Sequence, residues 1–183
     1  GDPTLSATLA AGGRAYLHQD SSGLDTWDKH GDLKNTTFRG WRFYAGPEGA
    51  ETQLGQGDQA AGWMELGDGV RGVAMGIDEF WQLFPNALVS RGDGRIQAEF
   101  FSRFQAGDHS LRAATQKTHK LRIRFSADGG AGTAVAMGSA LHPLLALAPP
   151  DYYLSTGCLR RTVPAAGSPA PDYELFEQAG LYG

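Results

Sequence analysis

Cysteine is almost absent from the sequence: Cys158 is the only one among 183 residues. A single thiol cannot form a disulfide within the chain, and no Cys/His spacing typical of a structural zinc site is present. No histidine lies close to Cys158 in the sequence, so we interpret it as a packed, unreactive thiol. The fold is therefore expected to depend on packing and hydrogen bonds alone.

The sequence also lacks an excess of positive charge and a long apolar run. Sixteen Lys and Arg against twenty Asp and Glu give a net charge of −4, which argues against a general nucleic-acid-binding protein. The longest weakly polar stretch, residues 131–150, contains His142, Pro143 and several glycines and is too interrupted to span a membrane. We expect neither nucleic acid nor a membrane as a partner. Residues 1–3 show no signal-peptide pattern, so any secretion signal has been removed or never belonged to this segment.

Motifs of several common enzyme classes are missing as well. The sequence contains no GxSxG elbow, P-loop, HExxH motif or glycine-rich nucleotide fingerprint, and we expect no cofactor. His18 and His30, with Asp20, Asp25 and Asp28 nearby, could in principle hold a divalent cation. Loop carboxylates more commonly just solvate the loop, so we predict no metal site.

Glycine, in contrast, is abundant, and its 26 residues punctuate short β-rich runs. The pattern predicts an all-β fold, an antiparallel β-sandwich with one or two short helices, with a barrel as the alternative. Gly67-Asp68-Gly69 and Gly92-Asp93-Gly94 are predicted hairpin turns, and residues 87–90 lead into the second of them. The predicted strands are Thr4–Leu9, Arg14–Gln19, Thr37–Tyr44, Gly62–Leu66, Val70–Met75, Arg95–Phe101 and Gln116–Phe125.

Two short helical segments are expected. Asp78 is a favourable N-cap residue and Pro85 ends the segment, which predicts one helical turn that packs Phe80, Trp81 and Phe84 in the core. A second helix is predicted in the Ala-, Leu- and Met-rich residues that begin at position 131 and end at position 147, just before two prolines.

The composition changes after Cys158, where Pro, Ala, Ser and Gly dominate. We predict a β-sandwich domain over residues 1–158 and a Pro/Ala-rich linker or C-terminal extension over residues 159–183. We expect this extension to be ordered, lying against the sandwich or a neighbouring molecule.

The predicted strand 116–125 carries the most informative chemical pattern. Alternation puts Lys117 and His119 on the same face as Leu121, Ile123 and Phe125, so this face should pass from the core into a polar cleft. Neighbouring cations lower each other's pKa, which favours a neutral His119 that can accept a proton. A histidine hydrogen-bonded at a sheet edge explains the same pattern.

Two further segments suggest ligand contacts. The strand that contains Tyr16 runs into a polar loop with Trp27, although such loops are common without function. In residues 38–44 one face carries Arg39 and Trp41, and an arginine beside an aromatic ring suits an acidic sugar. Structural Arg–Trp stacking between strands gives the same second pattern and is the more common reason for it.

Several stretches, in order over residues 15–157, together resemble the exo-acting rhamnogalacturonan lyase family and its uncharacterised bacterial relatives. The most specific are Phe80-Trp81-Gln82-Leu83-Phe84-Pro85 and Gln116-Lys117-Thr118-His119. The others are His18-Gln19-Asp20-Ser21-Ser22-Gly23, Phe38-Arg39-Gly40-Trp41, Ala61-Gly62-Trp63, Asn86-Ala87-Leu88 and Pro149-Pro150-Asp151-Tyr152-Tyr153. The resemblance implies that the chain is the central β-sandwich of a larger protein, between a β-barrel domain and a helical toroid.

For that family the resemblance implies β-elimination of a rhamnose–galacturonate polymer. This reaction needs a cation for the uronate carboxylate, a base for the C5 proton and an acid for the leaving oxygen. On chemical grounds the candidate catalytic residues are His119, Lys117 and Tyr16. The candidate substrate-binding residues are Gln19, Asp20, Ser21, Trp27, Arg39, Trp41 and Trp63.

Three functions remain open from the sequence. The chain can be a carbohydrate-directed β-sandwich module of a polysaccharide lyase-like protein that binds an acidic, pectin-like glycan. It can be an autonomous polysaccharide lyase. It can also be a structural spacer, with Trp41, Trp63 and Trp81 packing in the core or against neighbouring domains of a larger protein. The substrate class leads us to expect a secreted or periplasmic protein.

Overall fold

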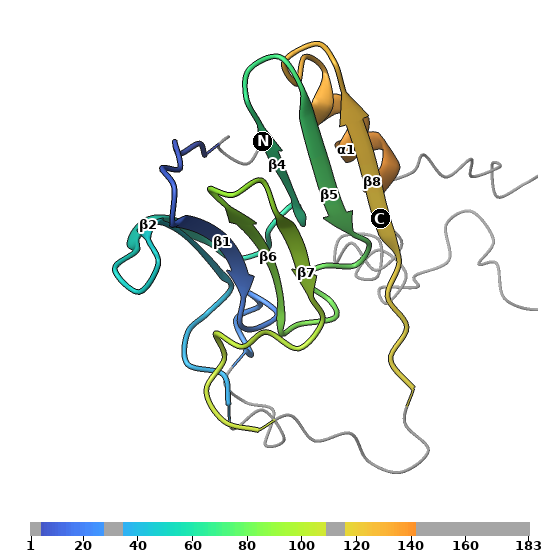
Figure 1. Cartoon of the computed structure of the whole chain (residues 1–183). Helices are drawn as coiled ribbons and strands as arrows, with labels where there is room; N and C mark the ends of the chain where they lie inside the picture. Colours follow the sequence, from blue (N-terminus) through green and yellow to red (C-terminus); the bar gives the residue numbers. More distant parts are fainter. Residues whose placement is uncertain (1–4, 28–34, 109–115, 142–183) are drawn as a thin grey trace, which may run out of the picture. The chain divides into compact units, whose positions relative to one another are not determined.

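The computed structural model describes residues 5–27, 35–108 and 116–141, all of which belong to one compact unit, Gly1–Leu141. The regular elements of these residues are strands and a single short helix (Figure 1). In chain order they are β1 (Gly13–Gln19), β2 (Trp41–Pro47), β3 (Thr52–Gly57), β4 (Trp63–Gly67), β5 (Gly72–Ile77), β6 (Asn86–Arg91), β7 (Ile96–Glu99), β8 (Leu121–Ser126) and α1 (Thr133–Leu141).

The strands form two antiparallel sheets. One has five strands in the order β3-β2-β1-β6-β7, and the other has three in the order β4-β5-β8. Strand β4 lies against β6 and β5 against β7, so the sheets face each other. The predicted all-β sandwich is therefore confirmed. Predicted features beyond Leu141, including Cys158 and the C-terminal extension, lie outside the described residues.

The core lies between the sheets and follows the alternation of the strands. On β2, Trp41 and Phe43 are buried, while Arg42 between them points to the opposite face. Met64 on β4 and Leu88 on β6 belong to the same apolar cluster, which also receives Phe80 from the turn after β5. Core packing is thus shared by both sheets.

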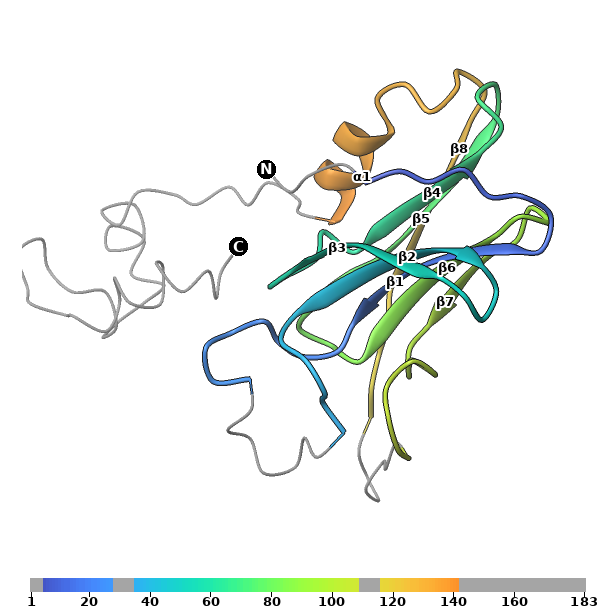
Figure 2. The same ribbon diagram turned by 90° about the vertical axis from the view of Figure 1, so that its left-hand side faces the viewer.

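Helix α1 covers the other face of the three-stranded sheet (Figure 2). Met137 and Leu141 pack against Ala74 and the partly buried Trp63. A Cβ atom at Gly76 would lie 2.7 Å from Cε of Met137 and 3.0 Å from Cδ1 of Leu141, so a side chain at this strand position would displace the ends of both helix residues. The predicted helix at 131–147 is confirmed for Thr133–Leu141.

Several predicted strand boundaries are wrong, and each has a structural reason. Residues 5–9 pair with no strand, and Leu5 and Leu9 instead pack on the core. Strand β2 begins at Trp41 rather than Thr37 because the backbone N–H groups of Thr37 and Phe38 donate to a side chain and not to a neighbouring strand. Strand β3 was not predicted, because its residues are mostly polar or glycine.

The predicted strand 116–125 begins only at Leu121. Leu121 pairs with Ile77, the last residue of β5, so residues 116–120 extend past the end of their partner strand. The helical turn expected after Asp78 is present as a single turn, in which the N–H of Leu83 donates to the Glu79 carbonyl at 2.9 Å. Both hairpin turns are confirmed: they join β4 to β5 and β6 to β7.

The expected orientation of β8 is also wrong. Leu121, Ile123 and Phe125 do not enter the core but are 43%, 52% and 81% exposed. Because β5 lies against β7, the edge strand of the larger sheet, β8 lies beyond that edge. On the opposite face Arg124 donates to the Thr133 hydroxyl at 2.5 Å, so the polar face of β8 is the one that contacts α1.

We predict that Gly40→Ala destabilises the fold far more than Gly94→Ala. Both glycines have positive φ, +71° and +88° respectively. A Cβ at Gly40 would lie 1.9 Å from the Gly57 carbonyl oxygen, whereas at Gly94 it would meet nothing within 4 Å. Urea unfolding should show a loss of about 3 kcal/mol or more for Gly40→Ala and about 1 kcal/mol for Gly94→Ala. Equal losses of stability in the two variants would contradict the close approach of Gly40 to Gly57.

Candidate functional site

One face of the five-stranded sheet points away from the core, and we call it the outer face. Strand register assigns its side chains, because residues that pair with outer-facing residues of β1 also face outward. From β3 to β7 they are Gln53, Gln56, Arg42, Tyr44, Arg14, Tyr16, His18, Ala87, Val89, Arg91, Gln97 and Glu99.

Aromatic rings and amides form a continuous row on the outer face. The Tyr16 ring stacks between Phe104 and Tyr44, with centroid distances of 3.8 and 4.9 Å. The Tyr44 hydroxyl donates to Oε1 of Gln53 at 3.2 Å, and Nε2 of Gln53 donates to Gln56 at 2.9 Å. Among the described ring pairs Tyr44 contacts only Tyr16, so no other ring covers its second face.

Most arginines on or beside this face are neutralised by carboxylates. Arg14 pairs with Glu48 at 2.9 Å and with Glu51 at 2.5 Å. Arg91 pairs with the second oxygen of Glu48 at 2.7 Å. The charges of the Arg14 and Arg91 guanidinium groups are thus both neutralised by ion pairs within the fold.

Arg42 is different from these arginines. Its guanidinium carbon lies 4.0 Å from the centroid of the Phe38 ring, in a cation–π contact. In the described part of the chain no carboxylate pairs with Arg42. The exposed Gln56 is its neighbour on β3, and Tyr44 lies two residues further along β2. Arg42 is therefore a positioned guanidinium that can bind a carboxylate of a ligand.

Gln19, predicted to bind substrate, is fully buried. Its Nε2 donates to the carbonyls of Ser21 at 2.7 Å and Asp58 at 2.8 Å. Its Oε1 accepts the Ala60 N–H at 3.0 Å. Gln19 thus holds the loop before β4 in place, and both its amide nitrogen and its amide oxygen are hydrogen-bonded inside the fold.

Asp20 and Ser21, also predicted to bind substrate, are equally buried. Asp20 Oδ2 accepts the N–H groups of Thr37 at 2.5 Å and Phe38 at 3.0 Å, and its Oδ1 lies 3.2 Å from Nε2 of His18. The Ser21 hydroxyl accepts the N–H of Gly40 at 2.8 Å. Burial alone would raise the pKa of Asp20, but the hydrogen bonds from His18 and the two backbone groups outweigh it and lower the pKa.

The remaining predicted substrate-binding residues lie apart from one another. Arg39, with a side chain 40% exposed, pairs with Asp25 at 2.7 Å and Asp58 at 2.8 Å, so its charge is neutralised locally. Trp27 is partly exposed in the adjoining loop. Trp41 is buried in the core, and Trp63 lies under α1.

Lys117 and His119 lie together on the extended segment before β8. Lys117 Nζ donates to the Phe100 carbonyl at 3.1 Å and lies 4.6 Å from the Phe101 ring centroid. The His119 ring stacks on Phe100 at 4.2 Å. Both His119 ring nitrogens are buried and have no hydrogen-bond partner among the described residues.

Burial changes the acidity of this pair. It lowers the pKa of Lys117 to about 8. Burial, and then the charge of Lys117, lower the pKa of His119. This shift has the direction predicted from the sequence, although burial is its larger cause. Neither side chain has a carboxylate partner in the described part of the chain.

Tyr16, the third predicted catalytic residue, is not brought close to this pair. It lies on the outer face of β1, and β6 and β7 stand between β1 and the segment that contains Lys117. Two strand spacings amount to about 10 Å. His119, in contrast, stacks on Phe100, which packs against the core between the sheets. Burial raises the pKa of Tyr16, so its hydroxyl stays protonated.

The described residues contain no group of three or more His, Cys, Asp or Glu side chains that could hold a metal ion. His30 and Asp28, two of the residues considered for such a site, lie outside the described ranges. No helix in the described ranges is long and apolar enough to cross a membrane.

Comparisons of this chain with family models, with curated proteins and with solved structures found no match.

Trp41, which was predicted to bind substrate, lies on the buried side of β2. Alternation places Arg42 and Tyr44 on one face and Trp41 on the other, but nothing in the pattern indicates which face is covered. Gln53 and Gln56 were overlooked because β3 lacks an apolar face. The sequence feature that could have indicated β3 is the pair of amide side chains, Gln53 and Gln56, that follows the turn after Gly46-Pro47.

We predict that Asp20→Asn costs about 2–3 kcal/mol of unfolding free energy at pH 7, because a buried acceptor of several hydrogen bonds is weakened. The lowered pKa of Asp20 means that its contribution is complete above the unfolded value of about 3.9. The contribution is lost as pH falls through the folded value. Urea unfolding between pH 7 and 3 should therefore show a smaller acid loss for the variant than for the parent. The exposed Asp128→Asn is the control, and an equal effect there would refute the assignment.

We also predict a stability change at alkaline pH that depends on Lys117. Its folded pKa of about 8 lies below the ordinary 10.5, so the unfolded chain binds more protons between these values and stability rises with pH across them. Lys117→Met should lack this rise and should be about 1 kcal/mol more stable at pH 7 after allowance for partial solvent screening. Lys120→Met, at an exposed position, serves as the control in urea titrations at pH 7–10. A rise that persists in Lys117→Met would assign it to another group.

Proposed function

We propose that this domain is a carbohydrate-binding β-sandwich module of a polysaccharide lyase-like protein, and that it binds an acidic, uronate-containing glycan of the pectin type. The observation that carries the proposal is Arg42, a guanidinium fixed on the Phe38 ring with no carboxylate partner in the described part of the chain. The outer face around it offers an aromatic ring and two exposed amides.

These groups match the chemistry of a uronate residue. The C–H face of a sugar ring can stack on the second face of Tyr44. The guanidinium of Arg42 can bind the carboxylate with two parallel hydrogen bonds. The amides of Gln53 and Gln56 donate and accept hydrogen bonds, as sugar hydroxyls require. All four side chains belong to the neighbouring strands β2 and β3, which keeps the site on a rigid sheet.

An autonomous lyase is the second candidate, because of Lys117. An amine with a pKa of about 8 can remove the C5 proton of a uronate. The C–H electron pair then forms the C4–C5 double bond, the C4–O bond breaks, and the leaving oxygen takes up a proton. The separation of Tyr16 from Lys117 and the burial of the His119 nitrogens favour the binding module. Pectin-like polymers occur outside the cytoplasm, so both candidates imply a secreted or periplasmic protein.

The proposal predicts that Arg42→Gln weakens glycan binding about tenfold, the usual effect of losing one charge-assisted contact. Calorimetry should compare rhamnogalacturonan and polygalacturonate with carboxyl-reduced polygalacturonate. The parent should bind the acidic polymers more tightly, and the variant should lose this preference. Arg95→Gln is the matched control, because Arg95 is an exposed arginine that pairs with Asp93 at a hairpin turn.

The same samples separate the alternatives. Absorbance of unsaturated uronate products that disappears in Lys117→Met and His119→Ala would establish a lyase in place of a binding module. No saturable binding and no cleavage would refute both and leave a structural spacer. If glycan binding is unchanged in Arg42→Gln, the binding site is not on the outer face.

A further inference from the structure

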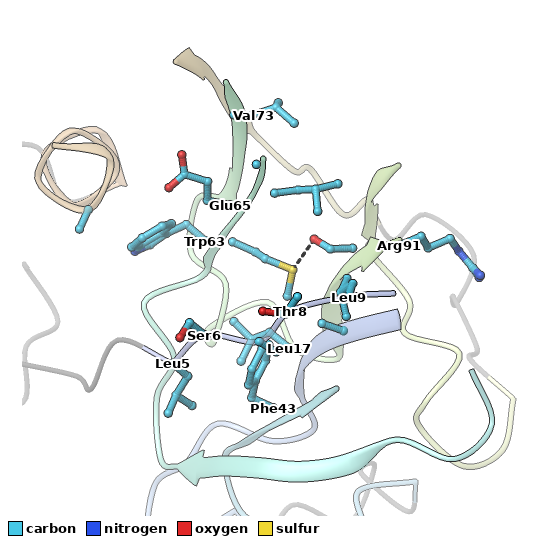
Figure 3. Close-up of a pocket in the computed structure, with 18 of the residues that line it drawn as sticks. Leu5, Ser6, Thr8, Leu9, Leu17, Phe43, Trp63, Glu65, Val73 and Arg91 are labelled. Carbon is cyan, nitrogen blue, oxygen red and sulfur yellow. Dashed lines mark hydrogen bonds between the residues drawn. The ribbon is translucent and has the colours of Figure 1, made fainter. Parts of the chain in front are cut away.

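A hollow of about 1450 Å³ is lined by residues of both sheets, by residues 5–9 and by two residues of α1, and it lies on the side of the larger sheet opposite the outer face (Figure 3). Pockets for small molecules commonly have volumes of about 300–1,000 Å³, so this space is large enough for a long ligand. Its main apolar walls are Leu17, Phe43, Met64, Val73, Leu5 and Leu9.

The hollow arises from a row of small side chains. In strand register Ala15 lies beside Ala45 on one side and beside Ser90 on the other, so three adjacent strands present small residues inward. Facing sheets pack about 10 Å apart, and larger side chains normally fill that distance. Leu66 and Val73 on the opposite sheet are only partly buried, as expected where nothing fills the space.

Several of the polar groups that line the hollow are already engaged within the fold. The Ser90 hydroxyl donates to the sulfur of Met64 at 2.8 Å, the contact drawn as a dashed line in Figure 3. Arg91 pairs with Glu48, and its side chain points away from the hollow in that view. Asp68 accepts the N–H groups of its own turn. The middle therefore suits an apolar group, because apolar cavities stay dry and take up apolar molecules.

The β4–β5 hairpin adds a cation to this apolar lining. Arg71 lines the hollow and forms no ion pair with any described residue. Phe125, which also lines the hollow, is 81% exposed. A ligand at this end would thus meet an unpaired guanidinium beside an exposed aromatic ring.

We infer that the hollow is a binding site for an unbranched amphiphile with an anionic head, of the fatty-acid class. The lining combines apolar side chains from both sheets with the guanidinium of Arg71, which suits an aliphatic chain that ends in an anionic group. The chain would lie along Leu17, Phe43 and Met64, and Arg71 would bind the carboxylate. This site is separated from the outer face by the sheet itself, so it does not depend on the proposed glycan site.

Calorimetry of the 183-residue chain with octanoate, decanoate and dodecanoate, below their micelle-forming concentrations, tests this inference. We expect one saturable site whose affinity rises about fourfold for each added methylene, the increment for burying one CH₂ group. Absence of saturable binding, or affinity independent of chain length, would overturn it.

Two variants locate the ligand. Val73→Trp should fill part of the hollow and weaken dodecanoate binding at least tenfold, whereas Val135→Trp, on an exposed position of α1 outside the hollow, should not. Arg71→Gln should weaken dodecanoate about tenfold and leave dodecanol unchanged, because only the carboxylate pairs with the guanidinium. If Val73→Trp does not fold, the Arg71→Gln variant alone tests the site. An equal loss of affinity for dodecanoate and dodecanol, or no loss for either, refutes it.

Discussion

The polar end of β1 is the constraint on which the rest of this fold depends. Gln19, Asp20 and Ser21 are fully buried, and a buried polar group is costly unless it is hydrogen-bonded. Their partners are backbone groups of two distant segments, residues 37–40 and 58–60. Because β1 is the central strand of its sheet, these bonds fix how the chain enters both β2 and β4.

The start of β2 in turn decides what the outer face presents. Thr37 and Phe38 are held by Asp20, and β2 begins after Gly40, so Trp41 and Phe43 point inward and Arg42 and Tyr44 outward. The same arrangement places the Phe38 ring beneath the Arg42 guanidinium. Carboxylates on the β2–β3 turn neutralise Arg14 and Arg91 but not Arg42. The outer face thereby keeps one positioned charge beside a ring and two amides, which is why we favour an acidic sugar there.

The unequal number of strands in the two sheets explains why the apolar face of β8 is exposed. A five-stranded sheet faces a three-stranded one that is displaced toward its β7 edge, so the apolar face of β8 has no strand opposite it. Small residues on the inner face of the larger sheet leave the hollow that we assign to an amphiphile. Lys117 and His119 both contact Phe100, just after β7; burial lowers the pKa of each, and the charge of Lys117 lowers that of His119 further.

The sequence alone determined the all-β class, since glycine-punctuated alternating runs such as 14–19 and 62–66 allow little else. It also determined both hairpin turns, and it indicated the direction of the His119 pKa shift, although burial in the tertiary structure is the larger cause. Tertiary structure decided that Asp20 is a structural acceptor, that Arg42 faces outward and that Phe125 is exposed. Alternation sorts residues into two faces, but which face is covered depends on the strands that lie opposite, and those come from distant parts of the chain.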